Sequence, residues 1–128
     1  MPERVLVDTC IWASVFAKPN SAENRAVEQL IEHDRVVVIG PVLAEVLCGF
    51  RRSEQADWAA SRLRNLGWIE VEWDDWRQAA AFGRQLAANG HRLPLTDLAI
   101  AAIASRHDLS VYTVDPEFDL LTNLQRFP

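Results

Sequence analysis

Short apolar runs alternate with longer amphipathic segments along this chain. Arg4 to Val7, Arg35 to Ile39 and Leu109 to Val114 are apolar, rich in β-branched residues and of strand length. The run RVVVI lacks any polar alternation, which is typical of a strand covered on both faces. Trp68 to Glu72 is another strand candidate, and Leu124 to Phe127 is a candidate for a fifth strand.

The segments between these runs have the periodicity of helices. Ser21 to His33 has apolar residues at i, i+4 and i+8, as on one face of a helix. Residues 97–106 include the stretch LAIAAIA, which is apolar on every face and predicts a helix buried in the domain. Further helices are expected over residues 9–17, from Gly40 to about Arg52, from Ser53 as N-cap to Leu66, and from Asp74 or Asp75 to Asn89-Gly90.

The alternation of strands and helices predicts a parallel sheet, because each return to a parallel neighbour needs a long crossover connection. The 128 residues suit one domain, and the sequence has no internal repeat, linker or low-complexity tract. We therefore predict a single domain over residues 1–128, of the α/β class, with three α/β/α layers and a central, mainly parallel sheet of four or five strands. Working sites in such folds lie at the carboxyl ends of the strands.

Acidic residues stand at that edge of the predicted sheet. Asp8 directly follows the first strand, and Asp115 directly follows the strand that contains SVYTV. Asp97 lies in the first turn of the apolar helix that leads into that strand, so it is expected at the same edge. Glu45 lies one turn into the helix after RVVVI, and Gly49 leaves room beside it. We expect these four carboxylates to converge.

Carboxylates gathered in a partly dry cleft repel one another, by about 3 to 4 kcal/mol per pair at ~4 to 5 Å with an effective dielectric of ~20. Either protonation of some of them, which raises their pKa, or a hard divalent cation offsets this repulsion. Mg²⁺ or Mn²⁺ suits an all-oxygen set and can activate water for attack on phosphorus. Asp8, Asp97 and Asp115 are the expected ligands, and Glu45 is expected to orient or deprotonate the water.

The overall charge bears on the kind of substrate. The chain has 13 basic and 18 acidic residues, and this net charge of −5 argues by itself against a nucleic-acid partner. However, Lys18 is the only lysine, so nearly all the basic side chains are arginines, which clasp phosphate in a fork. Acids gathered around a cation would also leave the remaining surface less acidic. A nucleic-acid substrate therefore stays open.

Localisation and metal chemistry of other kinds follow from what the sequence lacks. No apolar stretch approaches the roughly 20 residues of a membrane span, and the first residues show no signal-peptide pattern, so a cytoplasmic protein is expected. Cys10 and Cys48 have apolar neighbours and no ligand spacing, so we expect buried, reduced thiols. His33, His91 and His107 also lack metal-binding spacing and are expected on the surface.

Four segments in this order resemble the PIN-domain family, and specifically its VapC-like branch, the ribonuclease toxins of bacterial toxin–antitoxin pairs. They are VLVDTCIW, PVLAEVLCG, LPLTDLAIAAIA and VYTVDPEFD. The resemblance covers essentially the whole chain and puts Asp8, Glu45, Asp97 and Asp115 on the family's four acids, with Glu117 where many members have a further Asp. It implies a PIN-like fold, cleavage of single-stranded RNA, a homodimer, and inhibition by a cognate antitoxin lying over the active-site groove.

Further side chains are candidates for supporting roles, each with an ordinary structural or solvated role as the alternative. Candidates for positions around the metal are Thr9, Thr113, Glu117 and Asp119. Candidates for holding RNA phosphates, because they lie near the acid-bearing segments, are Arg51, Arg52 and Arg92. Three tryptophans, Trp58, Trp73 and Trp76, are expected to pack into the core from amphipathic helices, with a partner interface as the alternative.

Other acidic α/β domains fit the sequence less well. A haloacid-dehalogenase-type phosphatase needs a second Asp where this chain has Cys10, and a receiver domain needs a Lys where it has Thr113. A cysteine phosphatase needs Cys-x5-Arg, which neither cysteine provides. The remaining alternative is a PIN-like module that keeps the acids but binds RNA or protein with negligible turnover.

Overall fold

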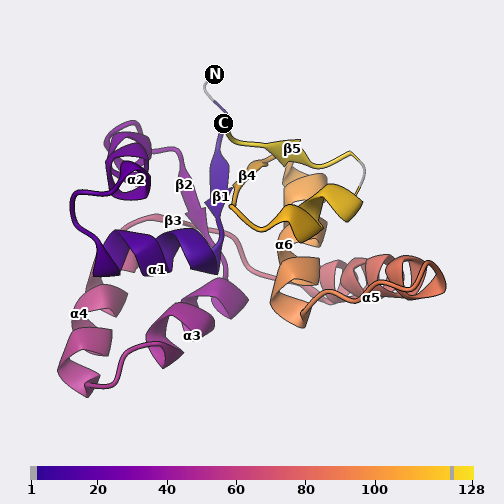
Figure 1. The fold of residues 1–128 in the computed structure, drawn as a ribbon, viewed down its shortest axis with the longest axis horizontal. Helices are drawn as coiled ribbons and strands as arrows, with labels where there is room; N and C mark the ends of the chain where they lie inside the picture. The colour runs from indigo at the N-terminus through magenta and orange to yellow at the C-terminus, as the bar shows by residue number, and fades with distance from the viewer. Residues whose placement is uncertain (1–2, 122) are drawn as a thin grey trace.

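Five parallel strands form one sheet in the order β3-β2-β1-β4-β5 in the computed structural model, which describes residues 3–121 and 123–128. The strands are β1 (Val5–Val7), β2 (Val36–Val38), β3 (Gly67–Trp68), β4 (Ser110–Tyr112) and β5 (Gln125–Arg126) (Figure 1). All four pairings between neighbouring strands are parallel. The prediction of a mainly parallel sheet of four or five strands is confirmed.

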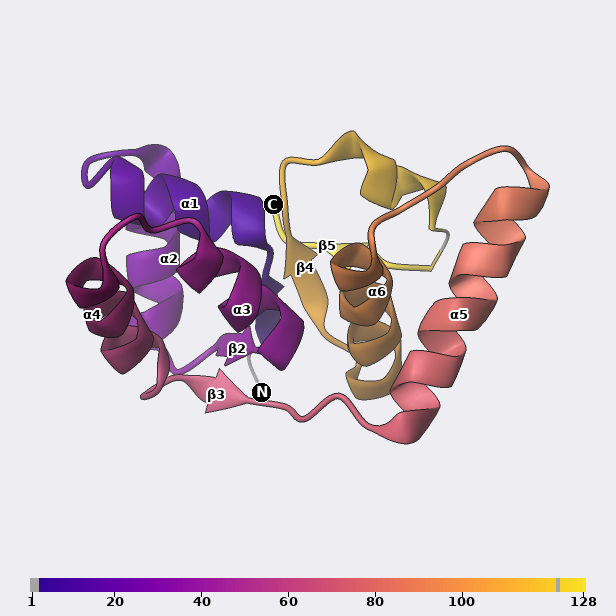
Figure 2. The same cartoon turned by 90° about the horizontal axis from the view of Figure 1, so that it is seen from below.

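Helices cover both faces of this sheet. The helices that connect β1, β2 and β3 lie on one side, and those between β3 and β4 lie on the other (Figure 2). The first group is α1 (Thr9–Ala17), α2 (Ala22–Glu32), α3 (Gly40–Cys48) and α4 (Ser53–Leu63), the second is α5 (Trp73–Ala88) and α6 (Leu95–His107), and a 3-10 turn, η1 (Pro116–Leu120), follows β4. The α/β/α layering is therefore as predicted. Among the described residues, no helix is both long and apolar enough to cross a membrane.

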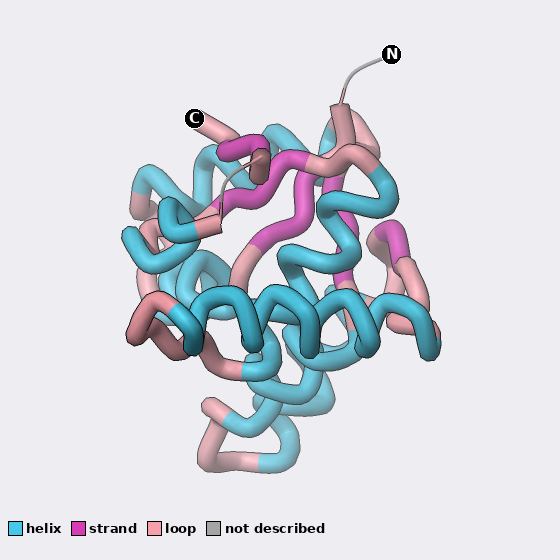
Figure 3. Tube along the Cα trace, turned by 90° about the vertical axis from the view of Figure 1, so that its right-hand side faces the viewer, coloured by secondary structure: helices cyan, strands magenta, loops and turns pink. Residues whose placement is uncertain are grey.

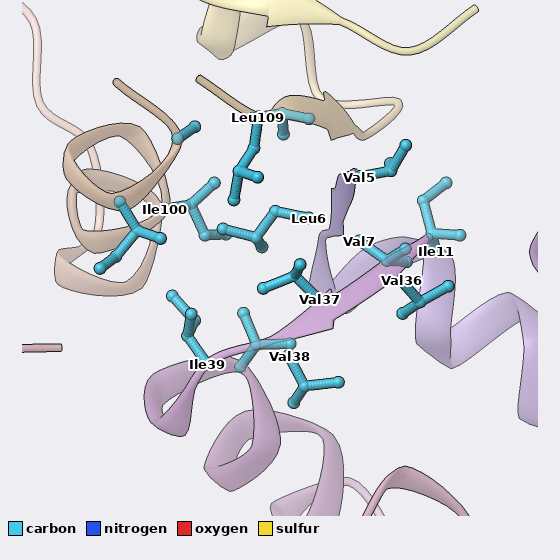
Figure 4. Packing of buried hydrophobic residues seen from close by; sticks show 14 of the residues in the cluster. Val5, Leu6, Val7, Ile11, Val36, Val37, Val38, Ile39, Ile100 and Leu109 are labelled. Atoms are coloured by element: carbon cyan, nitrogen blue, oxygen red, sulfur yellow. The ribbon is translucent and has the colours of Figure 1, made fainter. Parts of the chain in front are cut away.

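The core lies between the sheet and its helices. β1 and β2 are buried at every position, as their uninterrupted apolar sequences predict (Figure 4). In α6, every residue from Leu98 to Ala104 is buried, which confirms the prediction from LAIAAIA. The sheet is thus fixed from both sides directly beneath the residues that follow its strands.

α5 is the outermost helix and packs on α6 (Figure 3). Its first turn is held by a capping box, in which the Glu72 N–H donates to Asp75 Oδ2 over 2.9 Å. Arg106 near the end of α6 donates two hydrogen bonds to the same buried carboxylate, at 2.6 and 2.8 Å. Although burial raises the pKa of Asp75, these bonds outweigh it and hold that pKa below its usual value. One carboxylate therefore both starts α5 and fastens it to α6.

Several helix boundaries differ from the prediction. α3 ends at Cys48 instead of about Arg52, because the N–H groups of Gly49 and Phe50 bond to carbonyls only three residues back. The N-cap of α4 is Arg52, so the predicted cap, Ser53, is already inside the helix. α4 also ends at Leu63 rather than Leu66, and α5 begins at Trp73 with Glu72 as its cap.

The prediction that the three tryptophans pack into the core is wrong. Trp58, Trp73 and Trp76 are 54%, 79% and 41% exposed. The buried residues of α5 are Asp75, Ala79 and Leu86, and Trp73 and Trp76 lie outside this face. Gly83 also lets α5 approach α6 closely, since a Cβ added there would lie 3.2 Å from Leu98 Cδ1.

Two predictions about reactive side chains are also wrong. Cys48 is exposed, because it lies at the end of α3, beyond the buried face that contains Val42 and Val46. Cys10 is only half-buried. His107 is not a plain surface residue, since its Nε2 is buried at the end of α6.

Candidate active site

The strand order reverses between β1 and β4, because β2 and β3 extend the sheet from one side of β1 and β5 extends it from the far side of β4. In open α/β sheets the crevice at the carboxyl ends of such strands is the usual ligand site. Val7 of β1 is paired with Tyr112 of β4, and the next residue, Asp8, donates its N–H to the Tyr112 carbonyl over 2.9 Å. Asp8 and Thr113 therefore lie side by side at this reversal.

The Asp8 carboxylate is buried and held by three donors. Its Oδ1 accepts from the Thr9 N–H at 2.7 Å, and its Oδ2 accepts from Thr113 Oγ1 at 2.8 Å and from Cys10 Sγ at 3.3 Å. Burial raises the pKa of the Cys10 thiol, which keeps its proton available for this bond. Thr113 also accepts from the Asp115 N–H at 3.0 Å, so one threonine links the first acid to the last.

Asp97 is the electrostatic centre of the site. It lies in the first turn of α6 and is 9% exposed. Burial raises its pKa, and the negative charges of Asp8, Asp115, Glu45 and Glu117, in that order, raise it further, to about 7. Because Coulomb repulsion weakens with distance, this shift indicates that acids from three other segments lie around the Asp97 carboxyl group. The structure thus brings all four predicted acids to one edge of the sheet.

The closest trio of carboxylates differs from the predicted ligand set. Oxygens of Asp97, Asp115 and Glu117 lie within 4.8 Å of one another, an arrangement that suits a shared cation. Glu117, predicted as an outlying candidate, is a member of this trio, whereas Asp8 is predicted as a ligand but lies outside it. The Asp115 carboxylate accepts from the Glu117 N–H at 2.9 Å, so a tight turn at the start of η1 brings these two acids together.

Glu45 reaches the site from α3. It is exposed, and its Oε1 accepts a hydrogen bond from Thr9 Oγ1 at 2.8 Å. Thr9 therefore contacts two acids: its hydroxyl donates to Glu45, and its backbone N–H donates to the predicted ligand Asp8. The start of α1 is in this way joined to the acid-bearing turn of α3.

Asp119, predicted as a candidate for a position around the metal, forms an ion pair with Arg126 instead. Its exposed carboxylate accepts from Arg126 at 2.6 Å, and the same guanidinium donates to the Thr113 carbonyl at 3.2 Å. Arg126, in β5, therefore ties the loop after β4 to the last strand. Sequence reasoning missed it, because an arginine near the C-terminus shows no sign of its partner until β5 pairs with β4.

The three arginines proposed as phosphate contacts are all exposed. Arg51 and Arg52 form the bend between α3 and α4, and Arg92 lies in the loop before α6. Contact of these side chains with phosphate stays a prediction.

A sequence model of the PIN domain matches residues 5–124. The chain belongs to the PIN-domain family. Among curated relatives of this PIN-domain protein, Ribonuclease VapC5 from Mycobacterium tuberculosis is 32% identical over 84% of this chain and 83% of its own length.

Solved structures share the fold over nearly the whole chain. VapBC2 from Rickettsia felis, bound to a DNA fragment from its promoter, matches with a TM-score of 0.82 and 20% identity over 96% of each chain. A toxin–antitoxin complex from Klebsiella pneumoniae matches with a TM-score of 0.73 and 21% identity over 94% of each chain. At these identities the likeness establishes the fold, and the chemistry has to be argued from the acids themselves.

Proposed function

We propose that this PIN-domain protein is a metal-dependent endoribonuclease, the toxin of a toxin–antitoxin pair, which hydrolyses phosphodiester bonds of RNA at the acid cluster. The observation that supports this most directly is that Asp97, Asp115 and Glu117 bring carboxylate oxygens within 4.8 Å of one another at a site where Asp97 is buried. Burial and the charges of four neighbouring acids raise the Asp97 pKa to about 7. A cluster of this kind is costly to keep charged unless a cation or a proton compensates it. The related Ribonuclease VapC5 and the related toxin–antitoxin complex support the assignment.

The donor set fits Mg²⁺ or Mn²⁺. All candidate ligand atoms are carboxylate oxygens, and the group of residues whose ligand atoms lie together contains no histidine among the described residues. We propose Asp97 and Asp115 as ligands, with Asp8, the third ligand expected from the sequence, and Glu117 as the nearest additional donors. When bound, such a cation polarises a phosphoryl oxygen and lowers the pKa of a bound water.

The remaining side chains orient the acids and move a proton. Glu45 is held through one oxygen by Thr9, and its other oxygen has no hydrogen-bond donor among the described residues. That free oxygen suits Glu45 to accept a proton from the attacking water, which is its proposed role. Thr113 keeps Asp8 and Asp115 in fixed orientations through its two hydrogen bonds.

The test is cleavage of a labelled panel of single-stranded RNAs in Mg²⁺, Mn²⁺ or EDTA. We expect cleavage with either metal and none in EDTA, and we expect Asp8→Asn and Asp97→Asn to lose about 10³ in rate, or about 4 kcal/mol of transition-state stabilisation. Asp119→Asn is the matched control, because it removes a carboxylate paired with Arg126, and it should keep the parent rate within a few-fold.

Two outcomes would contradict the proposal. Cleavage that persists in EDTA, or substituted proteins as active as the parent, would mean that the acids do not perform the reaction. Tight RNA binding without cleavage by the parent would favour the alternative, a PIN-like module that binds RNA or protein without turnover.

The proposal includes the cytoplasm as the place of action and a homodimer as the active form. Two exposed tryptophans one turn apart at the start of α5 support self-association, since Trp73 is 79% and Trp76 41% exposed. We expect sedimentation equilibrium to give the mass of two chains for the parent and of one chain for Trp73→Glu. A parent that sediments as a single chain would exclude the homodimer.

A further inference from the structure

A groove of about 380 Å³ runs between α1 and α3 and begins at the candidate active site. At its inner end, Thr9 and Glu45 are joined by their 2.8 Å hydrogen bond. At its outer end, the Phe16 and Phe50 rings lie 5.7 Å apart, edge to face. The two helices therefore run in the same direction, with the acid site at one end of the space between them and two aromatic rings at the other.

The side chains between these ends are small. Ala13 and Ala17 line the groove from α1, and Gly49 lines it from the end of α3. All three are exposed, so the space opens to solvent along its length. The groove is therefore accessible to a ligand from solvent along these small side chains.

The lining selects against phosphate and favours an uncharged ring. None of the residues that line the groove is basic, and Glu45 is the single ionisable group among them. That carboxylate would repel a phosphate, whereas it would not repel an uncharged base lying on the apolar part of the lining. Unpaired bases also stack on aromatic side chains in proteins that bind single strands.

Phe50 is the ring available for such stacking. Phe16 is already engaged, since it stacks on Trp12 at 6.0 Å and meets Phe50 and Trp58 edge to face. Among the described ring pairs, Phe50 meets only Phe16. It lies just beyond the end of α3, and its side chain is half-buried. Phe50 packs partly against the core, and the rest of its side chain is accessible to solvent at the end of the groove.

We propose that this groove is a subsite for one unpaired nucleobase of the RNA substrate, the base next to the cleaved phosphodiester. The idea rests on the proposed ribonuclease function. Glu45 belongs both to the acids around Asp97 and to the groove lining, so a strand whose phosphate lies at the acids has its neighbouring base at the groove entrance. Stacking on Phe50 then fixes the register of the strand, and a base held in a duplex cannot enter.

The test combines two variants with RNA oligonucleotides that contain a single abasic site at each position around the cleaved bond. Phe50→Leu keeps an apolar side chain but removes the π face, and Ala13→Leu fills the groove from an exposed helical position without removing any packing. Phe127→Leu is the matched control, because Phe127 is a half-buried ring that packs on Tyr112 outside the groove. kcat/KM for cleavage and fluorescence anisotropy for binding are both measured.

With the parent, an abasic site at one position beside the cleaved bond should lower kcat/KM about tenfold, as expected for the loss of one stacked base. Phe50→Leu and Ala13→Leu should show a similar loss on intact RNA and no further loss at that abasic position. At other positions, the loss of kcat/KM caused by an abasic site should add to the loss caused by each variant. Phe127→Leu should give the same kcat/KM values as the parent.

Parental kinetics for both groove variants, or losses that add at every abasic position, would overturn the subsite. Variants that bind and cleave RNA normally but lose affinity for a protein partner would overturn it too and give the groove to that partner. A parent that cleaves no RNA would instead refute the ribonuclease function itself, and the subsite with it.

Discussion

At the scale of single residues, Asp97 is the acid whose ionised form is most strongly destabilised by burial and by neighbouring charges. Its carboxyl group is nearly buried and faces four other acids, so the folded protein holds its proton up to a pH of about 7. An unfolded chain releases that proton near pH 4. Between these two values the folded state binds more protons than the unfolded state, so stability without metal must fall as the pH rises.

This gives a prediction for the metal-free protein. In EDTA, the free energy of unfolding attributable to Asp97 should fall by on the order of 3 kcal/mol between pH 4.5 and pH 8. Urea denaturation at the two pH values measures it. Asp97→Asn should remove this fall, whereas Asp119→Asn, which alters a carboxylate paired outside the cluster, should retain it. At pH 8, Mg²⁺ should restore stability to the parent more than to Asp97→Asn.

An equal dependence on pH in the parent and in Asp97→Asn would contradict this account. It would mean that burial and repulsion are relieved in some other way, for example by opening of the loop that holds Asp115 and Glu117. No added stability in Mg²⁺ for the parent would contradict the proposed cation.

Which site residues the sequence could reveal depends on what fixes their place. Asp8 directly follows β1, and Asp115 follows the apolar run that contains β4, so their edge of the sheet is predictable from the chain alone. The partners of Thr9 and Asp119 are not, because they depend on how α3 and β5 pack against distant segments. Glu117 enters the closest trio of acids through the turn geometry of η1, which local residue type does not specify.

At the scale of elements, burial determines which segments form the central strands and helix, and local hydrogen bonds determine where the helices end. The apolar runs of β1, β2 and α6 predict buried elements because only the core can accept them. The ends of α3 and α4 are decided by carbonyls three or four residues back, where several registers differ little in energy. Sequence patterns therefore locate these elements more reliably than their last turns.

The outer helix shows a different limit of pattern reasoning. α5 begins with two tryptophans, and a large apolar residue in a helix is ordinarily assigned to the core. Yet α5 meets α6 through Ala79, Gly83 and Leu86, a seam that leaves no room for an indole. Close approach of small residues is a property of the pair of helices, and neither sequence segment alone predicts it.

At the scale of the whole molecule, α1 separates two grooves that share Phe16. One is the proposed base subsite between α1 and α3, and the other, of about 590 Å³, lies between α1, α2 and α4. The second groove is lined by Ile31, Trp58 and Leu66, with charged side chains also among its lining residues. A groove lined by both apolar and charged side chains suits an amphipathic segment of a partner protein, and we propose that the antitoxin of the proposed pair binds there.

Trp58 gives that proposal a specific contact. Its side chain lines the second groove and is 54% exposed, its ring meets Phe16 edge to face, and the Arg62 guanidinium lies 5.4 Å from the ring centroid. Tryptophans that a partner covers often contribute most of the binding energy. The Trp58 ring is thus held in place in the free protein and is open to a partner.

Trp58→Ala tests this contact, because it removes an exposed ring and keeps the buried face of α4, which contains Ala59 and Leu63. We expect the affinity for the antitoxin, measured by isothermal titration calorimetry, to fall about 10- to 30-fold, or about 1.4 to 2 kcal/mol. The thermal midpoint of the free protein should change little, because most of the Trp58 side chain is already exposed to water. RNA cleavage by the free variant should be unchanged, because Trp58 lies outside the groove that begins at the acids. Unchanged antitoxin affinity would show that the partner does not bind in this groove.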